Sequence, residues 1–331
     1  MTRAENTQAA RRAGRPGQTL DDTMNRLRSL LTNWATGVAA FLFLVANTLA
    51  CCTVLFLLAL VKLLVPLARV RAPLDRALNA VATCWVTGNS VWMRLTQRTE
   101  WDIQGSADLD TTRWYIVACN HQSWVDIFVL QRMLNRRVPL LKFFLKRELL
   151  YVPVMGLAWW ALDFPFMRRH SKRTLRADPR RAIDDAETSR RACAKFSRVP
   201  TSVMNFVEGT RLTSRKQAAQ ASPYRHLLKP KTGAMVASLE TLGDKFSAML
   251  DVTIVYPAGV PTFWDFLCGR VPRIVVRYRQ VAIPSVARDA HRSAAQVRAS
   301  LAGWLARVWA EKDAQIESLV TGSPSGPAGS R

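Results

Sequence analysis

Residues 113–130 read RWYIVACNHQSWVDIFVL, and they predict a strand that leads into a helix. The run at 113–119 is mostly apolar and is bounded by polar residues, so we expect a buried strand there. Ser123 stands ahead of the apolar residues 127–130 and predicts the N-cap of a helix that has Asp126 as its third residue. The polar residues in between are expected to form the connecting loop.

This loop contains His121, five positions before Asp126. Inside one helix the two side chains would point about 140° apart and could not meet. If Ser123 is the N-cap, however, His121 stays outside the helix, and the side chain of Asp126 leans back toward it. The carboxylate can then accept the Nδ1–H and leave Nε2 as a base, so the helix cap and a catalytic pair are compatible. Such a base can deprotonate a hydroxyl group that attacks an activated acyl group.

Other chemistries find little support in the sequence. The chain has no G-x-S-x-G, G-x-G-x-x-G or Walker motif, which argues against an acyl-serine hydrolase and a nucleotide-binding fold. None of its six cysteines forms a CxxC pair or a Cys/His spacing typical of zinc. We therefore expect no metal site and no bound cofactor.

The remaining pattern alternates short strands with helices, which predicts an α/β domain with a mixed sheet flanked by helices. We assign this domain to residues 67–318, followed by a flexible tail at 319–331. Within it, a helix is expected at 75–97. The other predicted strands are 99–104, 202–207, 251–256 and 274–281, and the other predicted helices are 140–150, 183–197, 232–242 and 292–318.

A membrane-embedded segment is predicted at residues 29–66, because no charge occurs between Arg28 and Lys62. As a helix this stretch would reach roughly 50 Å, more than the bilayer core of about 30 Å. Basic residues on both sides favour two cytoplasmic ends, and hence a helical hairpin in one leaflet that turns near Asn47–Thr48. A single tilted span is the alternative. Residues 1–28 are polar and basic, and we expect a disordered tail.

The chain carries 47 Lys+Arg against 24 Asp+Glu, a formal net charge of +23, so it should seek anions. Between residues 132 and 181, basic residues alternate with aromatic and aliphatic ones. Such a segment could bind single-stranded nucleic acid or an anionic lipid surface. Because an apolar segment lies nearby, we favour lipid and expect no nucleic acid partner.

Three further stretches suit a phosphate group. FVEGTR at 206–211 ends a predicted strand and offers a planar guanidinium, PFMRRH at 165–170 contains adjacent arginines, and KPKTG at 229–233 opens a predicted helix. Each is a weak signal alone, since surface Lys and Arg are common. Together with a histidine base and a membrane segment they suggest an enzyme that acts on an anionic lipid.

With these motifs the sequence resembles the glycerolipid acyltransferases of the bacterial 1-acylglycerol-3-phosphate acyltransferase type, over residues 85–285. NHQSWVD is similar to the NHxxxxD block of that family, and FVEGTR to its EGTR block. The resemblance implies His121 as the base and Asp126 as the residue that orients it. It further implies that the acceptor is held by Glu208, Gly209, Thr210, Arg211, Arg169 and Lys231. Within PFMRRH, Arg168 occupies a position at which the family usually has aspartate.

The resemblance implies transfer of a fatty acyl group from an acyl thioester, on coenzyme A or acyl-carrier protein, to the free hydroxyl of a lysophospholipid. It also implies a role in phospholipid biosynthesis at the bacterial inner membrane, with the active site facing the cytoplasm. Two alternatives remain open. One is a membrane-bound acyl thioesterase or lipid hydrolase, and the other is a non-catalytic protein that binds anionic lipid.

Overall fold

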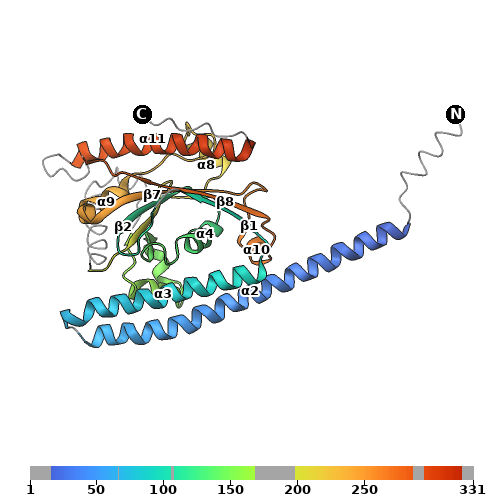
Figure 1. Cartoon of the computed structure of the whole chain (residues 1–331), viewed down its shortest axis with the longest axis horizontal. Coiled ribbons are helices and arrows are strands. Elements are labelled where there is room, and N and C mark those ends of the chain that lie inside the picture. Colours follow the sequence, from blue (N-terminus) through green and yellow to red (C-terminus); the bar gives the residue numbers. More distant parts are fainter. Residues whose placement is uncertain (1–15, 66, 106–107, 168–197, 286–293, 323–331) are drawn as a thin grey trace.

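The computed structural model describes residues 16–65, 67–105, 108–167, 198–285 and 294–322. Two long helices run side by side beneath a domain built on a six-stranded sheet (Figure 1). The helices are α2 (Pro16–Leu64), α3 (Ala68–Thr96), α4 (Val125–Leu134), η1 (Arg147–Tyr151), α5 (Met155–Ala161), α8 (Ser214–Ala219), α9 (Gly233–Leu242), η3 (Gly243–Lys245), α10 (Phe263–Leu267) and α11 (Ala294–Thr321). The strands are β1 (Glu100–Gly105), β2 (Trp114–Cys119), β3 (Leu141–Phe143), β4 (Leu145–Lys146), β5 (Phe166–Met167), β6 (Ser202–Phe206), β7 (Phe246–Val255) and β8 (Arg273–Val281).

The main sheet has the strand order β1-β8-β7-β2-β6-β3. Strands β7, β2, β6 and β3 are parallel to one another, whereas β8 is antiparallel to β7 and carries β1 parallel at the edge. Strands β4 and β5 form a separate pair. The predicted mixed sheet flanked by helices is confirmed. Because parallel strands need covered faces, the sheet lies between two helical layers.

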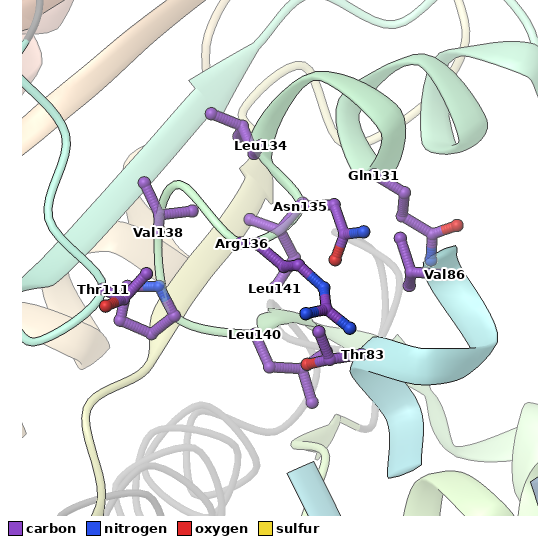
Figure 2. A pocket seen from close by; sticks show the side chains of 11 residues that line it. Thr83, Val86, Thr111, Gln131, Leu134, Asn135, Arg136, Val138, Leu140 and Leu141 are labelled. Atoms are coloured by element: carbon purple, nitrogen blue, oxygen red, sulfur yellow. The ribbon is translucent and has the colours of Figure 1, made fainter. Parts of the chain in front are cut away.

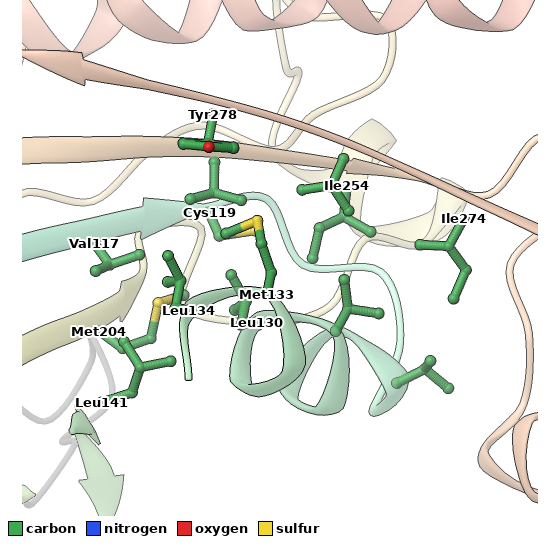
Figure 3. Packing of buried hydrophobic residues seen from close by; sticks show 14 of the residues in the cluster. Val117, Cys119, Leu130, Met133, Leu134, Leu141, Met204, Ile254, Ile274 and Tyr278 are labelled. Carbon is green, nitrogen blue, oxygen red and sulfur yellow. The ribbon is translucent and has the colours of Figure 1, made fainter. Parts of the chain in front are cut away.

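Strand β2 lies inside this sandwich. Tyr115, Val117 and Cys119 point to one face, where they pack against the apolar side of α4 and against α3 (Figure 3). Ile116 and Ala118 point to the other face, which α9 and α11 cover. All five side chains are at most 1% exposed, and this explains why the strand reads as a continuous apolar run.

The predicted hairpin turn at Asn47–Thr48 is wrong, because α2 continues through it to Leu64. The Asn47 amide instead donates to the Trp85 carbonyl and to Asn89 Oδ1, both on α3, at 2.9 Å. The polar residue is thus a contact between two helices, and the chain reverses between Leu64 and Ala68. The helix also begins at Pro16, so it overlaps the tail predicted at residues 1–28; residues 1–15 lie outside the described ranges.

Helix α2 is joined to the domain along much of its length. The Trp34 ring lies 5.1 Å from the Trp264 ring of α10. Near the C-terminal end of α2, the Lys62 ammonium pairs with the carboxylates of Asp75 and Asp163, each at 2.7 Å. The outer face of α2 nevertheless exposes apolar side chains from Leu30 to Leu64. Among the described residues this is the one helix long and apolar enough to cross a membrane, with a mean hydropathy of 2.4.

Another error concerns residues 140–150, where the structure has β3, β4 and η1 in place of the predicted helix. The apolar spacing of a segment this short fits either element. Pairing with β6 makes the beginning of this segment a strand, because Leu141 lies opposite Ser202 and Phe143 lies opposite Met204 in the sheet. The predicted helix at 183–197 lies outside the described residues.

We expect Gly88→Leu to push α2 and α3 apart. A Cβ on Gly88 would lie 2.7 Å from Asn47 Oδ1, so a larger side chain displaces the Asn47 contact. The free energy of unfolding should fall by about 1–3 kcal/mol, measured by thermal denaturation in detergent micelles. Gly303→Ala is the control, since nothing lies within 4 Å of its Cβ. Equal stability of the two variants would contradict this account of the helix pair.

Candidate active site

The site begins where β2 ends. Asn120 follows the last residue of the strand, and its side chain takes over the pairing with β7. The amide donates to the Ile254 carbonyl at 2.8 Å and accepts from the Ile254 N–H at 2.9 Å. This buried side chain fixes the point at which the backbone leaves the sheet, so His121 is placed at the carboxyl edge of the parallel strands, where α/β folds bind ligands.

The structure brings His121 and Asp126 into contact. Nδ1 of His121 lies 2.8 Å from Oδ2 of Asp126. A carboxylate can only accept, which assigns the proton to Nδ1 and leaves Nε2 as an acceptor. The His121 side chain is 14% exposed, whereas that of Asp126 is 1% exposed. One face of the imidazole is covered by the Phe206 ring, stacked at 3.9 Å and 15°.

Asp126 receives four hydrogen bonds. Besides the imidazole, Oδ2 accepts from the backbone N–H groups of Gln122 and Ser123 at 2.6 and 2.9 Å. Oδ1 accepts from the Tyr256 hydroxyl at 2.6 Å. Burial raises the pKa of Tyr256 well above its usual range, and the Asp126 carboxylate raises this pKa further, so Tyr256 stays a donor. Four donors compensate the cost of burying this carboxylate.

The start of α4 differs from the prediction. Trp124, not Ser123, is the N-cap, and Asp126 is the second residue of the helix. Trp124 already has helical φ and ψ, −60° and −24°. The Ser123 hydroxyl accepts from the Val125 N–H at 3.2 Å and donates to the Pro261 carbonyl at 2.7 Å. The Ser123 N–H also donates to Asp126 Oδ2 at 2.9 Å, so Ser123 makes the capping contacts that the sequence predicts although the regular helix begins at Val125, and its hydroxyl fixes the loop to the segment after β7.

Glu208 stands two residues after β6 and is fully buried. Its Oε1 accepts from the His121 backbone N–H at 3.3 Å, and its Oε2 accepts from the Leu228 N–H at 3.1 Å. Burial raises the pKa of Glu208 to about 8, although these two hydrogen bonds act in the opposite direction. Both carboxyl oxygens thus bond to backbone groups, and a contact between Glu208 and the acceptor's phosphate stays a prediction.

The rest of the EGTR turn faces the surface. Gly209 has φ +70°, a conformation that glycine tolerates best, and a Cβ there would lie 3.0 Å from Nζ of Lys231. Glycine therefore lets the Lys231 ammonium approach the turn. Thr210 accepts a hydrogen bond from Lys216 Nζ at 2.8 Å. The exposed Arg211 guanidinium lies over the exposed Trp124 ring at 5.3 Å.

Most of the predicted site residues therefore gather around one loop cluster. His121 and Asp126 touch, Glu208 holds the His121 backbone, and Lys231 reaches the turn that carries Arg211. Arg168 and Arg169 lie outside the described residues. Within the described ranges no group of three or more His, Cys, Asp or Glu side chains could hold a metal ion.

Sequence spacing missed the roles of three aromatic residues. Tyr256 lies directly after β7 and so near the carboxyl edge of the sheet, but no local spacing links it to Asp126, 130 positions earlier. Phe206 and Trp124 lie within the FVEGTR and NHQSWVD motifs, and this position was the only sign in the sequence that they belong to the site. Because stacking depends on tertiary packing, spacing alone does not reveal it.

A hollow of about 290 Å³ lies away from this site (Figure 2). Residues of α3, such as Thr83, line it together with Asn135 and Arg136, which follow α4. His121 precedes the start of α4, so the whole ten-residue helix separates the two places. Since none of the predicted site residues lines this hollow, we assign the chemistry to the loop cluster.

In sequence and in fold, the chain is similar to acyltransferase domains. A family model described as Acyltransferase matches residues 100–260. A solved structure, the 1-acyl-sn-glycerophosphate acyltransferase of Thermotoga maritima, covers 91% of this chain and 99% of its own at a TM-score of 0.53 and 15% identity, which supports the shared fold. The chain is thus similar to glycerolipid acyltransferases in sequence over residues 100–260 and in fold.

The chain is also similar to curated acyltransferases. The chain is 28% identical to lysocardiolipin acyltransferase 1 of Danio rerio over 61% of this chain and 51% of that protein. It is 24% identical to 1-acyl-sn-glycerol-3-phosphate acyltransferase gamma of Mus musculus over 68% and 58%, and 27% identical to the delta form over 62% and 53%. The chain thus spans about half the length of the curated relatives it matches.

We expect Tyr256→Phe to weaken the support of Asp126. The variant removes one of the donors to a buried carboxylate, which should lower the free energy of unfolding by about 1–3 kcal/mol. Tyr278→Phe is the control, since its hydroxyl accepts from Arg137 at 2.6 Å on a different part of the sheet. Chemical denaturation of both variants in detergent measures the difference. A Tyr256→Phe variant as stable as the natural protein would show that the hydroxyl contributes nothing.

Proposed function

We propose that this chain transfers a fatty acyl group from an acyl thioester to the free hydroxyl of a lysophospholipid of the 1-acylglycerol-3-phosphate type. The observation that supports this function best is the His121–Asp126 pair at 2.8 Å, with Nε2 of His121 left as an acceptor. The match to the Acyltransferase family model supports the reaction class, and the basic side chains of Arg211 and Lys231 on the neighbouring turn suit an anionic acceptor.

In the proposed reaction, His121 Nε2 takes the proton of the acceptor hydroxyl as its oxygen attacks the thioester carbonyl. The carbon–sulfur bond then breaks, and the leaving thiolate takes the proton from the imidazolium. The products are an ester and a thiol, and no covalent enzyme intermediate is needed. General-base help of this kind contributes about 10²–10⁴-fold, and Asp126 supports it by fixing the imidazole and stabilising its charged form.

The residues of the EGTR turn have separate roles in this proposal. Glu208 is a positioning residue, because its carboxyl group holds the backbone of His121. Arg211 and Lys231 supply positive charge for the acceptor's phosphate, and Gly209 permits the close approach of Lys231. Thr210 helps to shape the turn through Lys216. Arg169 belongs to the same proposal on the strength of the sequence resemblance.

The membrane placement is also a proposal. A helix that passed straight through a bilayer would carry its middle away from the domain, but the apolar part of α2, Leu30–Leu64, contacts the domain near both of its ends, through Trp34 and Lys62. Its exposed apolar face therefore favours a position along one leaflet. The predicted inner-membrane location, with the site facing the cytoplasm, fits a soluble acyl donor on coenzyme A or acyl-carrier protein.

We expect His121→Ala to lower turnover by about 10³-fold or more while the protein stays folded. His226→Ala is the matched control, because His226 also pairs with a carboxylate, Glu317 at 2.6 Å, but on the α11 side. The assay incubates purified protein with labelled acyl thioesters and a panel of lysophospholipids, and products are read by mass. Near-normal transfer by His121→Ala would rule out the mechanism. Thioester loss that is equal without acceptor would instead identify a hydrolase.

We expect Arg211→Ala to raise the KM for a phosphate-bearing acceptor about tenfold, the loss of roughly 1.4 kcal/mol of binding, with kcat little changed. The control is Arg215→Ala, an exposed arginine four residues on. Steady-state kinetics at saturating thioester measure both variants. An unchanged acceptor KM in Arg211→Ala would remove this residue from the acceptor site.

A further inference from the structure

Five large apolar side chains are exposed on α5 and on the residues just before it, and the proposed chemistry uses none of them. They are Tyr151, Val152, Val154, Leu157 and Trp160, with exposed fractions of 76%, 38%, 37%, 52% and 49%. We call these residues the α5 apolar patch. Single exposed apolar residues are ordinary, but a contiguous group of this size on a surface marks an interaction site.

The backbone that carries the α5 apolar patch is tightly constrained. Val154 has φ +64°, an unfavourable conformation for a β-branched residue. Gly156 is buried where a Cβ would collide with the Leu150 carbonyl, so the chain folds closely back on itself. Strain of this kind persists where the surrounding structure holds it, and it presents Val154 outward rather than into the core.

The opposite side of α5 packs on the two long helices. Ala158, Ala161 and Leu162 share a buried cluster with Leu55 of α2 and Leu78 of α3. The patch is therefore fixed relative to α2 and cannot move independently of it.

The residues around the α5 apolar patch indicate what the patch contacts. The neighbouring end of α2 exposes Leu57, Leu60, Leu63 and Leu64, each more than half exposed. The exposed residues just before the patch are Lys146, Arg147 and Glu148, which carry a net positive charge. Aliphatic side chains beside Tyr and Trp, with basic residues next to them, form the pattern of a surface that enters a membrane interface.

We propose that the α5 apolar patch inserts into the same leaflet as the apolar face of α2 and forms a second membrane contact. A single helix lying in a leaflet can roll about its long axis. A second contact beside that axis stops the roll. The two contacts together set the angle at which the domain, and with it the loop that carries His121, faces the lipid surface.

The first test needs no catalysis. A benzophenone amino acid replaces Leu157 in the full chain, and Val320 in a control, because Val320 is 54% exposed on α11 across the sheet from α2 (Figure 1). The proteins are bound to vesicles of phosphatidylethanolamine and phosphatidylglycerol and irradiated. We expect adducts with lipid acyl chains at position 157 and only background at 320. Background at 157, or adducts with a second protein chain, would overturn the proposal.

The second test rests on the proposed activity. Leu157→Glu should raise the apparent KM for an acceptor embedded in vesicles about tenfold, and leave the KM for a short-chain acceptor dissolved in water unchanged. Val320→Glu should change neither. An unchanged KM in vesicles, or an equal rise for the dissolved acceptor, would overturn a membrane role for the patch. Loss of all transfer in the natural protein would count against the proposed function, whereas the cross-linking result would stand.

Discussion

The buried carboxylate of Asp126 is the constraint on which the site depends. A charge that is 1% exposed must be compensated, and its donors come from the loop after β2 and from the residue after β7. The Asp126 carboxylate can therefore be fully hydrogen-bonded only if the adjacent strands β2 and β7 end at the same level of the sheet. Asn120 provides that match, because its side chain pairs with Ile254 at the last step of the sheet. The imidazole of His121 is positioned as a consequence of this arrangement.

The short EGTR turn contains both a buried residue and a residue exposed on the surface. Glu208 is buried and fixes backbone groups, whereas Arg211, three residues later, is exposed on an aromatic ring. Gly209 makes the transition possible through its positive φ. A motif match treats these residues as one unit. The physical environments differ, so a loss of Glu208 would disturb the backbone at His121, whereas a loss of Arg211 would change only the charge on the surface.

The sequence predicted the parts of the fold that local pattern controls. The apolar run of β2, the alternation of strands and helices, and the five-residue spacing between His121 and Asp126 were all visible. The remainder depended on partners distant in the chain. Residues 140–150 became strands because β6 lies beside them, and Asn47 joined two helices where a turn was expected. The Tyr256 contact with Asp126 spans 130 positions, and no local period encodes it.

The ion pairs of Lys62 have a consequence for how the protein is made. Its partner Asp163 lies 101 positions further along the chain. Its other partner, Asp75, follows soon after Lys62 in the sequence, on α3, and is therefore synthesised long before Asp163. The Lys62–Asp75 pair can therefore form as soon as α2 and α3 have been made, whereas the Lys62–Asp163 pair, which ties α2 to the domain, can close only later in synthesis.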